Sequence, residues 1–329
     1  MELTEQNISG VKLEKLRQDV KKKSRILRKL PFFLFFLFAA AAVIKHLDLF
    51  PYISEYGLNS SVTMEAFFGM LGGLMMAVVL TGTIFCFYYM LVWKKAYDRF
   101  NFSFKNKYVL DTIRQLPGFS DLRYNASGGI SYQEMEQLNL IPRGQSVFFE
   151  SSDELTGILD GVPFKASNVR TGKRTSSRSS TPEILFEGQI LIFSSFHDQK
   201  ISKGVVQVFS KKVLSKIKND AVPLKIQTEN SVFNENFAIF AENEQNAFYI
   251  LTPKMLEQII KFQESAKGQI YLTFSEKELY VSCSQFHNPF NAYIDISVEE
   301  QCRQIIKDTS ILRSARTLLI QAAEHKANI

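Results

Sequence analysis

Residues 67–93 read FFGMLGGLMMAVVLTGTIFCFYYMLVW, a run without a charged side chain. An α-helix rises about 1.5 Å per residue, so roughly 20 apolar residues cross the hydrocarbon core of a bilayer. This run is longer than that minimum and contains no proline. It is therefore predicted to be a transmembrane helix, and the rest of the chain is interpreted outward from it.

A second apolar run, LPFFLFFLFAAAAVI, occupies residues 30–44. We expect a transmembrane helix over 31–50, with Pro31 in its first turn, where a missing N–H removes no hydrogen bond. With 51–66 as a short external loop, the two helices form a hairpin. The alternative is a cleaved secretory signal with its cleavage region in the Ala-rich residues 39–42, which the long charged segment before the run disfavours.

Positive charge lies on one side of the predicted hairpin. Residues 1–30 carry nine basic and four acidic side chains, which accounts for +5 of the formal net charge of +6. Lys94 and Lys95 follow the second run directly. Because Lys and Arg that flank a span stay in the cytosol, we expect an integral protein of the cytoplasmic (inner) membrane with both termini cytosolic. The nearly neutral remainder argues against nucleic acid as a partner.

Small side chains recur every four residues along the second run, at Gly69, Gly73, Ala77 and Thr81. Such a stripe allows another helix to approach closely. Two interpretations follow. The stripe packs against the first helix of the same hairpin, or it is the contact through which the chain forms a homo-oligomer.

The segment 1–30 is predicted to be a basic, amphipathic cytosolic helix, because its apolar residues follow three- and four-residue spacing. They are Leu13, Leu16, Val20, Leu27 and Leu30. Three interpretations stay open: packing against the segment after the second span, binding to anionic lipid, and a role in topology alone. Residues 94–116 are predicted to form a cytosolic helical stalk, with an aromatic stripe at Tyr97, Phe100, Phe104 and Tyr108.

Beyond the stalk, residues 117–329 are predicted to fold as a soluble α+β domain of antiparallel strands and a few helices. Asp160-Gly161 is a hairpin turn signal between two apolar segments. Further strands are expected at 146–150, 184–196, 204–210, 224–228, 237–242 and 247–251, with a second hairpin across 275–277. The strands cluster between helices without regular βαβ alternation, which disfavours a doubly wound sheet.

Local capping signals predict three helices of this domain. Ser131 and Glu134 form a capping box, and Ser297 and Glu300 form another before the last helix. Thr252 is predicted to cap a third helix, with proline at its first position.

Three segments carry a resemblance to a known family, together with the two apolar runs. They are PFKASNV at 163–169, FEGQILIF at 186–193 and FAIFAENEQNAFYILTPKMLEQII at 237–260. The chain resembles the bacterial membrane proteins grouped as domain of unknown function 3137. That resemblance implies a membrane-tethered cytosolic domain, and it supplies no established activity, cofactor or catalytic residue.

Candidate catalytic residues are few. His197 and Asp198 could act as acid and base if a cleft surrounds them, although adjacent residues in a turn usually point apart. Cys283 and His287 could form a nucleophile and base, although a cysteine at a strand end is usually an inert apolar residue. The histidine and cysteine spacings match no metal-site or disulfide pattern, and we expect no metal and no cofactor.

The polar segment 171–182 is a candidate anion-binding loop because it joins Lys173, Arg174 and Arg178 with many hydroxyl groups. It could also be phosphorylated, and the simpler interpretation is a connection between strands. It lacks the GxxxxGK[ST] pattern of a nucleotide-binding loop.

Together these observations predict a non-enzymatic binding or scaffold module that the lipid bilayer holds close to a protein partner. The alternative is a hydrolase or transferase that acts on membrane-proximal substrates at the cytosolic face. A transporter is disfavoured, since neither apolar run contains an intramembrane charge.

Overall fold

The computed structural model describes residues 2–46, 61–137, 141–142, 144–174, 181–194, 202, 204–212, 224–266, 268–284 and 290–327. The chain divides into two compact units. The helical unit comprises Met1–Phe104 and Ala292–Val298, and the sheet unit comprises Lys105–Asn291 and Glu299–Ile329.

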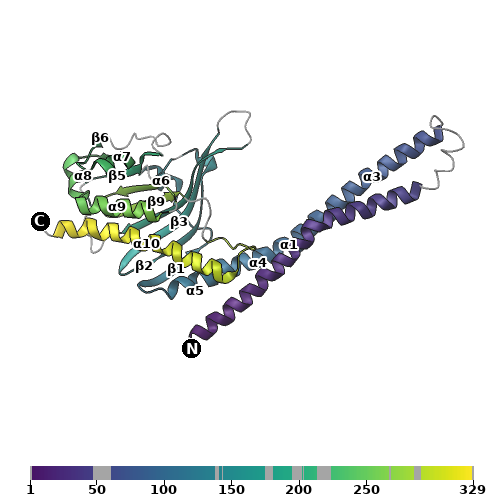
Figure 1. Ribbon diagram of the computed structural model, residues 1–329, viewed down its shortest axis with the longest axis horizontal. Helices are drawn as coiled ribbons and strands as arrows, with labels where there is room; N and C mark the ends of the chain where they lie inside the picture. The colour runs from purple at the N-terminus through teal and green to yellow at the C-terminus, as the bar shows by residue number, and fades with distance from the viewer. Residues whose placement is uncertain are drawn as a thin grey trace. The chain divides into compact units, whose positions relative to one another are not determined.

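The helical unit is built on two long helices that lie side by side (Figure 1). Helix α1 spans Glu2–His46 and helix α3 spans Ser61–Tyr88. After α3 the chain continues through a π-helical turn, η2 (Tyr89–Lys94), into α4 (Lys95–Ser103). Residues 47–60, which include most of the predicted external loop, lie outside the described residues, and 61–66 belong to α3.

Helix α1 runs without a break through the predicted basic helix and into the first apolar run. Pro31 therefore lies in the helix interior, and its predicted place in a first turn is wrong. The charged segment before Pro31 consists largely of good helix formers, so helix propagates through the proline. The ring removes one backbone hydrogen bond there, which is the usual origin of a local bend.

Among the described residues of the sheet unit, nine strands form one sheet in the order β1-β2-β3-β4-β9-β8-β5-β7-β6. All pairings between these described strands are antiparallel. The strands are β1 (Phe119–Asn125), β2 (Glu150–Leu159), β3 (Val162–Lys173), β4 (Glu183–Ser194), β5 (Val206–Ser210), β6 (Leu224–Ile226), β7 (Phe237–Ala241), β8 (Ile270–Phe274) and β9 (Glu278–Ser284). The α+β class is thus confirmed.

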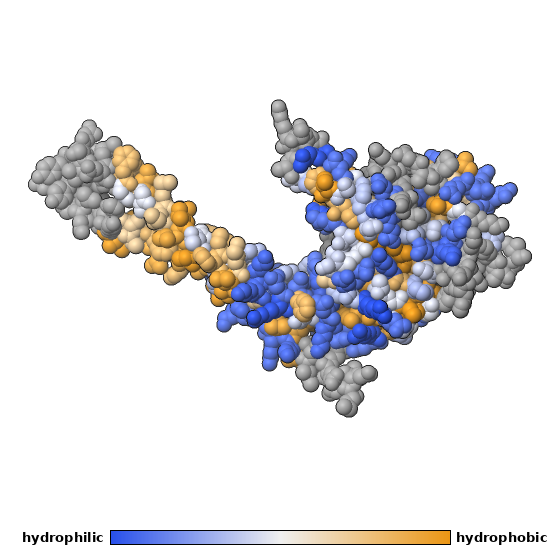
Figure 2. Space-filling view, turned by 180° about the vertical axis from the view of Figure 1, so that it is seen from behind, coloured by the Kyte–Doolittle hydropathy of each residue, from blue (hydrophilic) through white to orange (hydrophobic). Residues whose placement is uncertain are grey.

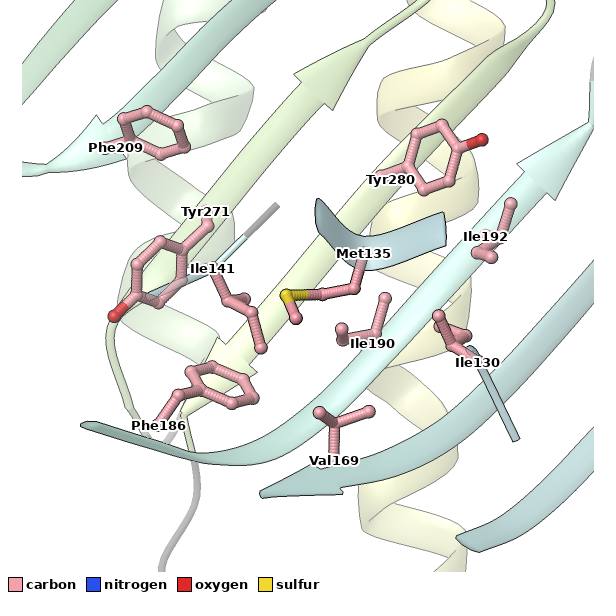
Figure 3. Close-up of a cluster of buried hydrophobic side chains, with 10 residues drawn as sticks. All are labelled: Ile130, Met135, Ile141, Val169, Phe186, Ile190, Ile192, Phe209, Tyr271 and Tyr280. Carbon is pink, nitrogen blue, oxygen red and sulfur yellow. The ribbon is translucent and has the colours of Figure 1, made fainter. Parts of the chain in front are cut away.

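Helices cover both faces of this sheet. They are α5 (Leu110–Arg114), which follows the π-helical turn η3 (Phe104–Val109), then α6 (Tyr132–Gln137), α7 (Ser231–Asn236), α8 (Glu244–Ile250), α9 (Pro253–Ser265) and α10 (Val298–Ala327). Figure 3 shows Met135 of α6 packed against Ile190 and Val169 on one face. The neighbouring residues Leu191 of β4 and Leu155 of β2 point to the other face, where they meet side chains of α10. The core therefore has two layers, one on each side of the strands.

The predicted Asp160-Gly161 turn and the caps at Ser131 and Thr252 are confirmed, and the Ser297–Glu300 capping box stays a prediction. Leu159 pairs with Val162 across Asp160-Gly161, and both turn residues have positive φ (45° and 83°), as a type I′ turn requires. The Thr252 hydroxyl accepts a hydrogen bond from the Met255 N–H and caps α9.

Two predicted strands are wrong. Residues 146–148 form a short 3-10 turn, η4, and the strand begins only at Glu150. Residues 244–250 form helix α8, because the Asn243 side chain accepts from the Asn246 N–H and starts a helix there. Strand β1 was not predicted, since its alternating exposed polar residues give a weak apolar signal.

Candidate functional sites

The most distinctive surface of the helical unit is apolar. Within the described part of the chain, two helices are long and apolar enough to cross a membrane, over Gly10–Ile44 and Phe67–Arg114. Their large exposed side chains include Phe32, Phe33, Phe36, Phe67, Phe68, Met75, Met76, Val78, Val79, Phe87 and Met90. Figure 2 shows this hydrophobic length with hydrophilic surface directly beside it. A contiguous apolar surface of this extent marks contact with a membrane or a partner.

The predicted small-residue stripe lies partly between the two helices. A Cβ atom added at Gly73 would stand 2.9 Å from Ala42 Cβ of α1, so glycine permits the close approach there. Ala77 and Thr81 are buried, whereas Gly69 is exposed. This is the geometry of packing within the hairpin, and homo-oligomerisation stays a prediction.

An aromatic ladder marks the end of the apolar run. The rings of Tyr89 and Trp93 stack with centroids 5.3 Å apart, and those of Trp93 and Tyr97 stack at the same distance. The π-helical turn η2 carries the first two of these rings. Amphipathic rings at the end of a span are typical of the membrane–water interface.

The N-terminal half of α1 packs within the helical unit. Leu13 and Val20 are buried, and α1 contacts α4. This is the packed arrangement, one of the three that the sequence left open for the segment 1–30.

A clamp joins this half of α1 to the segment 292–298. The Arg17 guanidinium binds the Glu14 carboxylate at 2.5 Å and donates to the Ile294 carbonyl at 2.6 Å. Glu14 also accepts from the Val298 N–H at 3.1 Å. The hydrogen bond from Arg17 is the main reason that the pKa of Glu14 is lowered. The clamp therefore holds both side chains in their charged forms.

In the sheet unit, a buried carboxylate collects donors from four segments; we call this group the Asp153 cluster. Lys105 Nζ lies 2.7 Å from Asp153 Oδ1, which also accepts from the Tyr124 hydroxyl. Asn168 Nδ2 and Ser152 Oγ each donate to Oδ2 at 3.2 Å. The side chains of Asp153 and Lys105 are 2% and 13% exposed, so the ion pair is removed from water.

The local backbone explains why the carboxylate points inward. Asp153 has φ +57° and lies where the register of β2 against β3 shifts. Asp is among the few residues other than glycine that tolerate this left-handed region. A bulge re-aims a side chain, and here it turns the carboxylate toward η3, which supplies Lys105.

The Asp153 cluster favours a fixed arrangement over proton transfer. Burial, followed by the hydrogen bond to Asp153, raises the pKa of Tyr124, so the phenol stays protonated as a donor. Each carboxylate oxygen already receives two protein donors. The cluster therefore ties β1, β2, β3 and η3 together.

A small cavity adjoins this cluster. The rings of Tyr124 and Phe290 lie with their centroids 6.1 Å apart, and Phe290 lines the cavity. Its volume is about 20 Å³, and a cavity needs roughly 10–15 Å³ to hold one water molecule. The lining also includes Leu155, Ala166, Gln189, Leu191, Ile305, Asp308, Thr309, Ile311 and Leu312. This space suits ordered water rather than a substrate.

The predicted catalytic pairs are only partly described. Cys283 is fully buried in β9, and burial raises its pKa to about 12. Its thiol is therefore protonated at neutral pH and is not a ready nucleophile. His287, His197 and Asp198 lie outside the described residues. Among the residues that are described, no group of His, Cys, Asp and Glu could hold a metal ion.

The candidate anion-binding loop has two described cations, and both contact other protein groups. Lys173 ends β3 and lies 3.5 Å from Glu183 of β4. The Arg174 guanidinium lies over the Phe148 ring at 5.9 Å. Arg178 lies outside the described residues, so anion binding by this loop stays a prediction.

Sequence reasoning did not find the Asp153 cluster. Lys105 and Asp153 are 48 residues apart, and no motif links them. The signal that could have found it is the polar SSDE stretch at 151–154, because an acidic residue inside a strand next to apolar positions needs a partner.

These observations define a class of protein: an antiparallel α+β unit joined to a pair of helices of membrane-spanning length. Residues 184–314 match the family model described as "Protein of unknown function (DUF3137)", which confirms the resemblance expected from the sequence. The match begins in β4 and ends within α10. No curated protein and no solved structure matches the chain.

Proposed function

We propose that this protein is anchored in the cytoplasmic membrane by the α1–α3 hairpin and holds its sheet unit in the cytosol as a binding or scaffold module. The observation that carries the proposal is the exposed apolar surface of the two helices. Exposure of each such side chain to water is less favourable than its burial by a free energy of roughly 1.5–3 kcal/mol. In hydrocarbon the same surface is favourable.

The orientation follows from the ends of the hairpin. Lys94 and Lys95 follow the second apolar run, and six basic residues lie between 21 and 29. Cations at these positions favour retention on the cytosolic side, so both termini and the sheet unit are placed there.

The binding role draws on exposed apolar side chains near one edge of the sheet. Leu224 of the edge strand β6, Val232 of α7 and Phe248 of α8 are 45%, 56% and 45% exposed. Helix α8 contacts β6, and α7 contacts the next strand, β7. We propose this surface, the β6 edge, as the contact for a protein partner. The buried, protonated Cys283 is not a ready nucleophile, which removes one of the catalytic candidates.

Two experiments test the anchor and its orientation. Carbonate extraction of membranes should leave the full chain in the pellet, and protease should digest the sheet unit in inverted vesicles but not in intact cells. Extraction into the supernatant, or digestion in intact cells, would contradict the anchor and its orientation.

A photo-crosslinker at Val232 or Phe248 should then capture a discrete protein in intact cells. The matched control is the same crosslinker at Val147, which is 79% exposed and lies on η4, away from the β6 edge in sequence and in strand order. Recovery of the chain alone from both edge positions would contradict the binding role.

A further inference from the structure

Basic side chains lie on both helices of the helical unit, near the point where its apolar length ends. We call them the basic collar: Lys21, Lys22, Arg25, Arg28 and Lys29 of α1, Lys94 of η2, and Lys95 and Arg99 of α4. Because Ala42 lies against Gly73 in this antiparallel pair, equal steps away from that contact bring Lys21 level with Lys94. Lys22 is level with Trp93 by the same count, and the other cations of α1 follow over the next two turns, beside the end of the apolar run.

The collar has little internal compensation. Among the residues that the structure describes, none of its eight side chains makes an ion pair. Lys23 does so instead, with Asp19 at 2.6 Å. Within 20–30 and 93–99 the sequence carries nine basic residues and one acidic residue, Asp98. Like charges at this density repel each other unless an anion lies between them.

The position of the collar selects the kind of anion. Lys94 and Lys95 lie beside the Tyr89–Trp93–Tyr97 ladder, whose rings mark the level of an interface. Lipid headgroups would occupy that level. Lys and Arg at an anionic leaflet each gain about 1 kcal/mol, which corresponds to roughly fivefold in binding.

We propose that the basic collar binds the headgroups of anionic phospholipids and enriches them around the hairpin. This inference rests on the proposed membrane anchor. It extends the anchor because membrane insertion needs only apolar surface, whereas enrichment needs the cations of both helices.

Trp93 provides the test because it is the single tryptophan of the chain and lies within the collar. The full-length protein is reconstituted into phosphatidylcholine vesicles that contain a small fraction of brominated phosphatidylglycerol or of brominated phosphatidylcholine. Bromine quenches tryptophan only at short range. We expect quenching by the brominated phosphatidylglycerol to exceed quenching by the brominated phosphatidylcholine several-fold, and high salt to remove the excess.

The test variant is Lys21→Gln/Lys94→Gln/Lys95→Gln, which leaves Arg25, Arg28 and Lys29 to maintain orientation. It should lose most of the excess quenching, and Lys→Arg at the same three positions should retain it. The matched control, Lys254→Gln/Lys261→Gln/Lys307→Gln, removes the same charge from exposed positions of α9 and α10 and should behave as the wild type.

Equal quenching of the wild type by both lipids would overturn the collar while leaving the anchor intact. Absence of quenching by either lipid would overturn the anchor and the collar together. An excess that the triple Gln variant retains in full would show that Lys21, Lys94 and Lys95 do not contribute, and would overturn the collar as a joint site of both helices. If that variant does not fold, the salt dependence of the wild type decides, because an excess insensitive to salt contradicts an electrostatic origin.

Discussion

Replacing Lys105 by methionine tests whether the Asp153 cluster ties the sheet unit together. Methionine keeps the apolar stem of lysine but leaves the Asp153 carboxylate, 2% exposed, without its cation. Breaking a buried pair by removing one partner costs about 3–5 kcal/mol, because the remaining charge is desolvated and uncompensated. We expect Lys105→Met to lower the stability of β1, β2 and β3 by that amount.

Hydrogen exchange of the full-length protein in detergent measures the effect directly. The opening free energy of amides in β2 and β3 should fall by about 3–5 kcal/mol in Lys105→Met. The matched control is Lys107→Met, since Lys107 lies on the same π-helical turn but is exposed. That change should stay within about 0.5 kcal/mol of the wild type.

A double variant separates charge burial from packing. Lys105→Met/Asp153→Asn removes both charges, and asparagine tolerates the φ of +57° at position 153. It should recover most of the loss, since replacing a buried ion pair by neutral groups is often close to neutral. A single variant that loses less than about 1 kcal/mol, or a double variant no more stable than the single one, would refute the reasoning.

Three further outcomes are expected. Gly73→Leu should separate α1 from α3, because any Cβ there meets Ala42, whereas Gly72→Leu should not. The separation is measured by the yield of disulfide crosslinks between engineered cysteines in the two helices. Equal crosslink yields in the two variants would contradict the prediction. The pKa of Glu14 is lowered from 4.5, so its clamp stabilises the folded form above pH 4.5 and is lost as pH falls through the folded pKa. The protection factor of the Val298 amide, which corrects for the intrinsic pH dependence of exchange, should fall there in the wild type but not in Glu14→Gln. Cys283 should resist iodoacetamide at neutral pH until urea unfolds the chain, and rapid labelling of the native protein would show that the thiol is accessible.

Features predicted well from the sequence are local ones. The two apolar helices follow from composition alone, because hydropathy adds up along a single helix. The Asp160-Gly161 turn and the Thr252 cap follow from the conformational preferences of one or two residues. The error at 247–251 also has a local cause: an apolar run of this length suits a strand or a buried helix turn, and the Asn243 cap decides for helix.

The candidate sites were harder to predict, for a related reason. The small-residue stripe was visible as a pattern, yet its contact with Ala42 depends on which helix lies opposite Gly73. The Asp153 cluster depends on a register shift in β2, and no sequence pattern predicts that shift.

By itself, the sequence determined the two apolar helices, the basic flanks, the antiparallel α+β class and several turns and caps. The tertiary structure alone decided that β9 lies between β4 and β8, that β5 lies between β8 and β7, and that Lys105 meets Asp153. Pairing between distant segments depends on the total apolar area that the sheet buries and on the backbone hydrogen bonds that all of its strands form together. The residues of one strand therefore do not indicate, in the sequence, which distant strand they pair with.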